Sequence, residues 1–129
     1  MVDEGRDGAV LCMLFLDLVG DKQLGLLICE RSTLWLKSLV RKTVTDHKMD
    51  HIIVDSDVSN DDHRAFLKRG IPAIDRIDFR YPNTSNDYWH NKDDTLDKCS
   101  AASLGLVGRL TLALLPRLAL EGQRQRANR

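Results

Sequence analysis

Carboxylate and imidazole side chains occur at three places in the sequence that one edge of a sheet could bring together. Asp17 ends a ten-residue apolar run, Asp61 and Asp62 precede a short helical pattern, and His90 follows the next apolar segment. Ligands of α/β proteins gather at the carboxyl ends of parallel strands, so we expect these side chains to converge. Carboxylates combined with an imidazole suit zinc, and the same groups can carry protons.

Each of these residues also has a purely structural interpretation. Asp17 fits a turn or capping role at the end of a strand. Asp61 and Asp62 suit a helix N-terminus, where unpaired N–H groups and the helix dipole favour negative charge. His90 follows Trp89 in a polar loop, and an isolated loop histidine is usually solvated. The spacing alone leaves both interpretations open.

The apolar pattern predicts the elements that would position these residues. Strands are predicted at 9–18, 51–54 and 71–77, with a further short apolar segment at 24–28. Helices are predicted at 32–45, 63–69 and 100–118, the second closed by Gly70 and the third kinked or ended by Pro116. Alternation of strands and helices indicates the α/β class with a mostly parallel sheet.

Composition restricts the partners and the compartment. The chain has 129 residues, enough for one domain, and its 19 basic residues balance 19 acidic ones. Zero net charge gives no reason to expect nucleic acid or a membrane as partner. We expect a disordered N-terminus at 1–8, a domain at 9–119 and a polar tail at 120–129. The polar N-terminus is no secretory signal, which predicts a cytoplasmic product as encoded.

Three segments, in the same order, resemble the motifs of one enzyme family. Residues 60–73, NDDHRAFLKRGIPA, are similar to a signature of metallopeptidase family twenty-eight and the related glutaminyl-peptide cyclotransferases. Residues 88–98, YWHNKDDTLDK, resemble the family's segment around its zinc-binding histidine, and 14–20, LFLDLVG, its strand-end aspartate motif. Trp89 and the doubled Asp favour the cyclotransferase-like branch.

The resemblance implies a fold, a cofactor and residue roles. The fold would be part of a three-layer α/β/α zinc-exopeptidase-like domain, its C-terminal half, acting on peptide or protein N-termini with zinc. His90 would bind zinc, and Asp17 would bind a second zinc or join a hydrogen-bond network. Asp61 would belong to the same network, whereas Trp89 and Asn60 would contact the substrate.

The chain also departs from the family pattern. The family's bridging Asp and its Glu-Glu pair lie upstream of the strand that carries Asp17, where this sequence has only sixteen residues. Asn91 replaces the family's usual Thr. One His and one or two carboxylates are too few for a tight zinc site. We therefore expect a chain inactive alone, completed by an N-terminal half chain or self-associated, whose parent enzyme is secreted or periplasmic.

Two other functions fit parts of the pattern. The chain could be a catalytically inactive remnant or protein-interaction module that retains the half-fold. A magnesium-dependent phosphoesterase would use Asp61, Asp62, Asp93 and Asp94, but no glycine loop that could hold phosphate is visible.

Overall fold

The computed structural model describes residues 10–54 and 61–127. The three strands are β1 (Met13–Asp17), β2 (Leu27–Ile28) and β3 (Ala73–Ile77). The α-helices are α1 (Leu34–Asp46), α2 (His63–Lys68) and α3 (Ala101–Ala127). Two 3-10 turns, η2 (Asp50–Ile52) and η3 (Leu96–Lys98), lie in the connections.

The strands form one sheet with β3 in the middle. The order is β1-β3-β2, with β1 parallel to β3 and β2 antiparallel to it. Met13 pairs with Ala73 and Asp17 with Ile77, so β1 and β3 end side by side. All five residues of β3 are buried, because the strand has a neighbour on each edge and helices on both faces.

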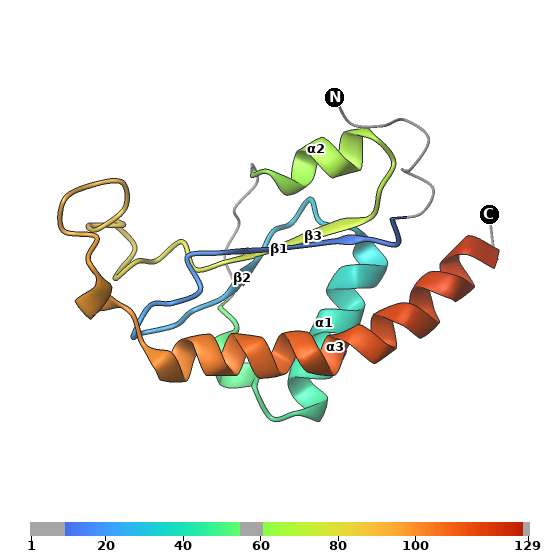
Figure 1. The fold of residues 1–129 in the computed structure, drawn as a ribbon. Helices are drawn as coiled ribbons and strands as arrows, with labels where there is room; N and C mark the ends of the chain where they lie inside the picture. Colours follow the sequence, from blue (N-terminus) through green and yellow to red (C-terminus); the bar gives the residue numbers. More distant parts are fainter. Residues whose placement is uncertain (1–9, 55–60, 128–129) are drawn as a thin grey trace.

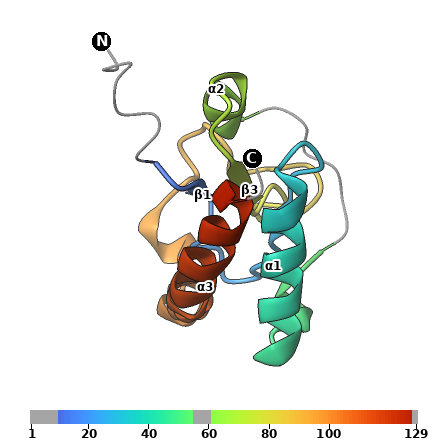
Figure 2. The ribbon, with the colours of Figure 1, turned by 90° about the vertical axis from the view of Figure 1, so that its right-hand side faces the viewer.

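The helices form two layers around the sheet. In Figure 1, α2 lies on one side of the strands and α1 and α3 lie on the other. Figure 2, seen along α3, shows the same separation, with α1 and α3 side by side. The predicted α/β/α arrangement is therefore confirmed, as a small version with three strands.

The hydrophobic core lies between the sheet and the α1–α3 layer. Ile28 of β2, Ile74 of β3 and Leu26, which directly precedes β2, pack there against both helices. Burial of apolar surface is the main stabilising contribution in such a layer. The buried helix residues are Leu36, Val40 and Val44 of α1 and Val107, Leu110, Leu114 and Leu118 of α3.

The helix α3 extends further than the sequence suggested. It contains Pro116 and continues to Ala127, so the proline does not end it and most of the expected polar tail is helical. The helix bends along its course (Figure 1), as proline within a helix causes. Within the described part of the chain, α3 alone is long and apolar enough to cross a membrane, judged by length and composition only.

A second difference concerns the strand predicted at 51–54. The structure has the 3-10 turn η2 there, and only an isolated bridge joins Leu26 to Ile53. Leu26 N–H donates to Ile52 O at 2.7 Å, and Val54 N–H donates to Leu26 O at 2.9 Å. The segment thus pairs with one residue only. The predicted disordered N-terminus at 1–8 lies outside the described residues.

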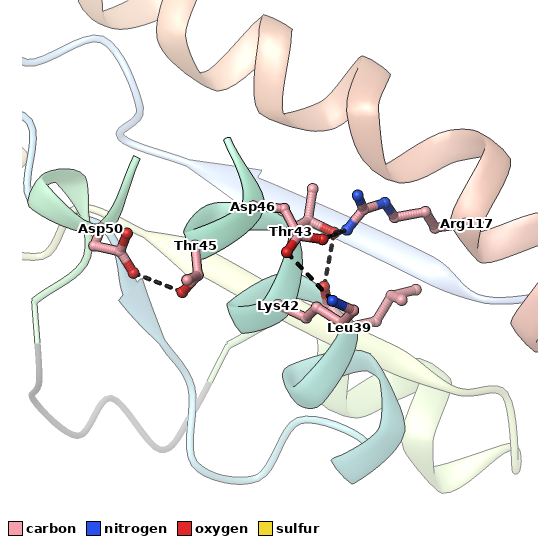
Figure 3. A network of polar contacts seen from close by, with 7 residues as sticks. All are labelled: Leu39, Lys42, Thr43, Thr45, Asp46, Asp50 and Arg117. Atoms are coloured by element: carbon pink, nitrogen blue, oxygen red, sulfur yellow. Dashed lines mark hydrogen bonds and ion pairs between the residues drawn. The ribbon is translucent and has the colours of Figure 1, made fainter. Parts of the chain in front are cut away.

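Polar contacts tie α1 to α3 (Figure 3). Arg117 Nη1 donates to Asp46 Oδ2 at 2.7 Å and to Thr43 Oγ1 at 3.1 Å. Lys42 Nζ also contacts Asp46, at 3.2 Å, from within α1. The Arg117 guanidinium, followed by the Lys42 ammonium, lowers the pKa of Asp46 below its ordinary value. Arg117 is therefore the residue of this group that couples the two helices.

Replacing Arg117 with Ala should lower the melting temperature by about 1–5 °C, because a partly exposed ion pair contributes little. The lowered pKa means that the contribution of Asp46 is present above its ordinary pKa and is lost as the pH falls. Thermal unfolding at pH 7 and pH 3 measures both effects. Lys42→Ala is the control and should have the smaller effect, since Lys42 contacts only its own helix; an equal or larger effect would contradict the coupling role.

Candidate functional site

Asp17 lies at the end of β1, where the sequence placed it. Its Oδ1 accepts the Leu18 N–H at 2.9 Å, and Leu18 has a left-handed φ of 52°. Burial raises the pKa of Asp17, and the negative charges of Asp61 and Asp62 act in the same direction. The Leu18 N–H and the charge of His90 oppose this shift. Asp17 is therefore within electrostatic reach of Asp61, Asp62 and His90.

Asp61 and Asp62 precede α2 on the opposite side of the sheet from α1 and α3. Asp61 Oδ1 accepts the Asp62 N–H at 2.7 Å, and Asp61 O accepts the Arg64 N–H at 3.0 Å. Asp62 occupies the N-cap position but makes no side-chain capping hydrogen bond, so the expected capping role is wrong. Asn60 lies outside the described residues, and its predicted role in substrate binding stays a prediction.

Trp89 and His90 lie in the long loop after β3. Their rings stack at 4.3 Å between centroids, and Phe79 contacts the Trp89 ring edge-on at 5.3 Å. Both residues are exposed, and His90 has a left-handed φ of 56°. The imidazole is thus accessible from solvent and fixed on one face by an aromatic ring. This arrangement suits a residue that meets a ligand arriving from outside.

Two acidic residues near the end of this loop, Asp94 and Asp97, make contacts within the loop itself. Tyr81 O–H donates to Asp94 Oδ1 at 2.7 Å, and burial raises the pKa of Tyr81 strongly. Asp97 contacts Thr95 and Lys98 instead, and these contacts lower its pKa to about 2. Asp94 therefore helps hold the loop, which does not favour the magnesium site that included it.

The zinc site that the family resemblance implies would take two donors from this chain, the His90 imidazole and the Asp17 carboxylate. Both are zinc ligands in proteins, and they are close enough to interact electrostatically. Zinc normally takes three or four protein ligands. Within the described residues, Asp17, Asp61 and His90 do not form a group whose ligand atoms all approach within 4.8 Å. The two donors fit zinc as part of a larger ligand set.

A second group of polar residues, which the sequence did not indicate, is buried beneath α2. The ligand atoms of Cys29, His63 and Asp75 all lie within 4.8 Å of one another. Each of the three residues has an exposed fraction of 0%. We call these residues the buried triad. It was missed because the apolar pattern described Asp75 only as part of a strand and placed Cys29 in no predicted element.

Asp75 is the most perturbed carboxyl of this region. Burial raises its pKa to about 7, and the charges of Asp61 and Asp17 add to the effect. The next residue, Arg76, points to the opposite face of β3, where its Nη2 donates to Thr111 Oγ1 at 3.3 Å. Two charged residues within a buried strand are a signal that the sequence does contain, because burying charge is costly unless it is paired.

Comparison with known proteins gives a consistent result. Residues 8–115 match the family model described as Peptidase family M28. Among solved structures, the chain is similar to the glutaminyl cyclase of an Acidobacteriales bacterium, with 32% identity and a TM-score of 0.81 over 94% of this chain and 42% of that one. It also resembles in fold the Porphyromonas gingivalis glutaminyl cyclase, with 24% identity and a TM-score of 0.68 over 81% of this chain and 41% of that one. A search of curated proteins finds no match.

Proposed function

Because the chain belongs to peptidase family M28, we propose that it contributes the His90 side of a zinc-dependent glutaminyl-peptide cyclotransferase domain. The observation that carries this proposal is the 32% identity and the TM-score of 0.81 with a glutaminyl cyclase over 94% of this chain. The chain spans 42% of that cyclase, so the remaining zinc ligands would come from another polypeptide segment. Aminopeptidase activity is the alternative within the same family.

The reaction would close the N-terminal glutamine of a peptide into a ring. The α-amino nitrogen attacks the carbon of the side-chain carboxamide, a C–N bond forms, and ammonia leaves. Zinc, when bound, supplies Lewis-acid polarisation of that carbonyl. His90 would hold the metal from this chain, and the exposed Trp89 ring would form a wall for the substrate side chain.

The carboxyl groups of Asp17 and Asp61 would transfer the proton that moves during ring closure. The pKa of Asp17 is raised by burial and by the charges of Asp61 and Asp62, so Asp17 takes up a proton more readily than a solvated carboxylate does. Asp17 Oδ1 is engaged by the Leu18 N–H, which leaves Oδ2 to take up that proton. We assign to Asp17 and Asp61 the role of receiving a proton from the attacking amine and returning it to the leaving ammonia.

A chimera tests this proposal, in which this chain replaces the matching segment of the Acidobacteriales glutaminyl cyclase. We expect the zinc-loaded chimera to convert N-terminal glutamine peptides to pyroglutamyl peptides, seen as loss of ammonia by mass spectrometry. His90→Ala should weaken zinc binding at least about tenfold, as the loss of a metal-site residue does. His51→Ala is the matched control, an exposed histidine in η2, and should change neither zinc binding nor activity.

Two other outcomes of the chimera experiment would lead to different conclusions. A folded, zinc-loaded chimera that hydrolyses aminoacyl-anilides without forming pyroglutamate would assign aminopeptidase chemistry. A folded chimera that has neither activity, or that binds zinc equally well after His90→Ala, would reject the proposal. That result would favour the inactive interaction module.

A further inference from the structure

The buried triad joins three elements that are far apart in the sequence. Cys29 directly follows β2, Asp75 lies in the middle of β3, and His63 is the first residue of α2. Cys29 N–H donates to Asp75 O at 3.2 Å, so these two are cross-strand neighbours. Neighbours across an antiparallel pair carry their side chains on the same face. That face is the one covered by α2, which brings His63 onto them.

Two of these three residues, His63 and Asp75, carry buried polar atoms that lack the partners that burial normally requires. His63 Nδ1 and Nε2 and both carboxylate oxygens of Asp75 are buried without a hydrogen-bond partner. The closest approach recorded between the two residues, from His63 Nδ1 to Asp75 Oδ2, is 3.7 Å, too long for a hydrogen bond. Buried polar groups in native proteins almost always have partners. A missing ligand would account for four such atoms at one place.

We propose that Cys29, His63 and Asp75 bind a zinc ion. Zinc bond lengths of about 2.0–2.3 Å place tetrahedral ligand atoms about 3.3–3.6 Å apart. The 3.7 Å separation of His63 Nδ1 and Asp75 Oδ2 is already close to this range, and the third atom lies within 4.8 Å of both. Side-chain adjustments of about 1 Å would complete the geometry that zinc requires.

The donor set selects the kind of metal. A thiolate with an imidazole and one carboxylate matches the borderline preference of zinc, whereas magnesium and calcium prefer oxygen ligands. The proposed ion would cross-link β2, β3 and α2 and so stabilise the layer that carries Asp61. This zinc is separate from the one that His90 would hold, because His90 is not among its ligands.

Cobalt(II) provides the direct test in the full chain, since it replaces zinc and reports on its ligands by absorption. The protein is prepared metal-free, with His90→Ala as the background so that the other candidate site cannot contribute. We expect one Co²⁺ per chain, with a thiolate-to-metal charge-transfer band in the near ultraviolet and visible bands typical of four-coordinate cobalt. Added Zn²⁺ should displace the cobalt and abolish both features.

Matched cysteine variants locate the sulfur ligand. Cys29→Ser should abolish the charge-transfer band, and Asp75→Asn should weaken Co²⁺ binding at least tenfold. Cys12→Ser and Cys99→Ser are the controls, because Cys12 is half-buried and Cys99 is exposed; neither should alter the spectrum. Circular dichroism of each variant establishes that it is folded.

The proposal is overturned if the folded chain gives no thiolate–cobalt absorption at saturating Co²⁺. It is equally overturned if the band survives Cys29→Ser or disappears in Cys99→Ser. If Cys29→Ser does not fold, the spectrum of the protein with all three cysteines still decides. In that case, selective loss of the band after alkylation of Cys12 and Cys99 alone, mapped by mass spectrometry, would reject Cys29 as the ligand.

Discussion

Replacing Leu114 with Ala is expected to lower the free energy of unfolding by about 2–5 kcal/mol. Leu114 lies in the middle of α3, has an exposed fraction of 0%, and packs in the core between α1 and the sheet. Removing its side-chain carbons costs their transfer free energy and leaves a cavity that the helix layer can close only in part. Because small domains are stable by only about 5–15 kcal/mol, this is a large fraction of the total.

Leu112→Ala is the matched control for that experiment. Leu112 belongs to the same helix but has an exposed fraction of 68%. Both substitutions remove the same atoms and have the same small effect on helix propensity, so their difference isolates burial. Chemical denaturation at pH 7 measures both. Equal losses for the two variants would mean that α3 does not pack on the sheet as described.

Asp75→Asn is expected to change how stability depends on pH. The pKa of Asp75 is raised from 3.8 to about 7 in the folded chain, mainly by burial. Between these values the folded state binds more protons at Asp75 than the unfolded state, so the contribution of Asp75 to stability is greatest below pH 4 and falls as the pH rises to 7. One pKa unit corresponds to about 1.4 kcal/mol, so the decline attributable to Asp75 is on the order of 4 kcal/mol. Asn cannot ionise, so the substitution should remove this decline in stability.

The measurement requires metal-free protein, with unfolding followed between pH 4 and pH 8 in chelator. His63 acts in the opposite direction, since burial lowers its pKa and its protonation opposes folding as the pH falls below 6.5. The difference between the natural chain and Asp75→Asn removes this contribution. Asp46→Asn is the control, because the pKa of Asp46 is lowered and its loss should destabilise the chain at high pH. If Asp75→Asn leaves the pH dependence of stability unchanged, the pKa of Asp75 is not raised by burial as described.

The apolar pattern of the sequence predicted the elements that form the core. The run at 9–18 contains β1, and the leucines spaced along 100–118 include those of α3 that face the sheet. The apolar pattern predicts these helices because each helix has one buried face. The pattern failed at η2, where the segment after α1 pairs through one residue only. Pairing partners depend on the tertiary structure, which local periodicity does not contain.

The site could be predicted in part. Family motifs indicated Asp17, Asp61 and His90, and the structure puts Asp61 and His90 within electrostatic reach of Asp17. No spacing rule connects Cys29 with Asp75, since 46 positions separate them along the chain and only the β2–β3 pairing makes them neighbours. The buried triad therefore required coordinates. Two charges inside an otherwise apolar segment were the one local sign of it.

The opposite charges of Asp75 and Arg76 have a consequence for how β3 aligns between its neighbours. Successive side chains of a strand project to opposite faces, so a slip of one residue would exchange the two layers they enter. The guanidinium would then meet His63 under α2 and lose its hydrogen bond to Thr111, and the carboxylate would enter the leucine layer of α3. A register shifted by one residue therefore costs free energy on both faces of the sheet. The sequence of this five-residue strand therefore favours the observed register over registers shifted by one residue.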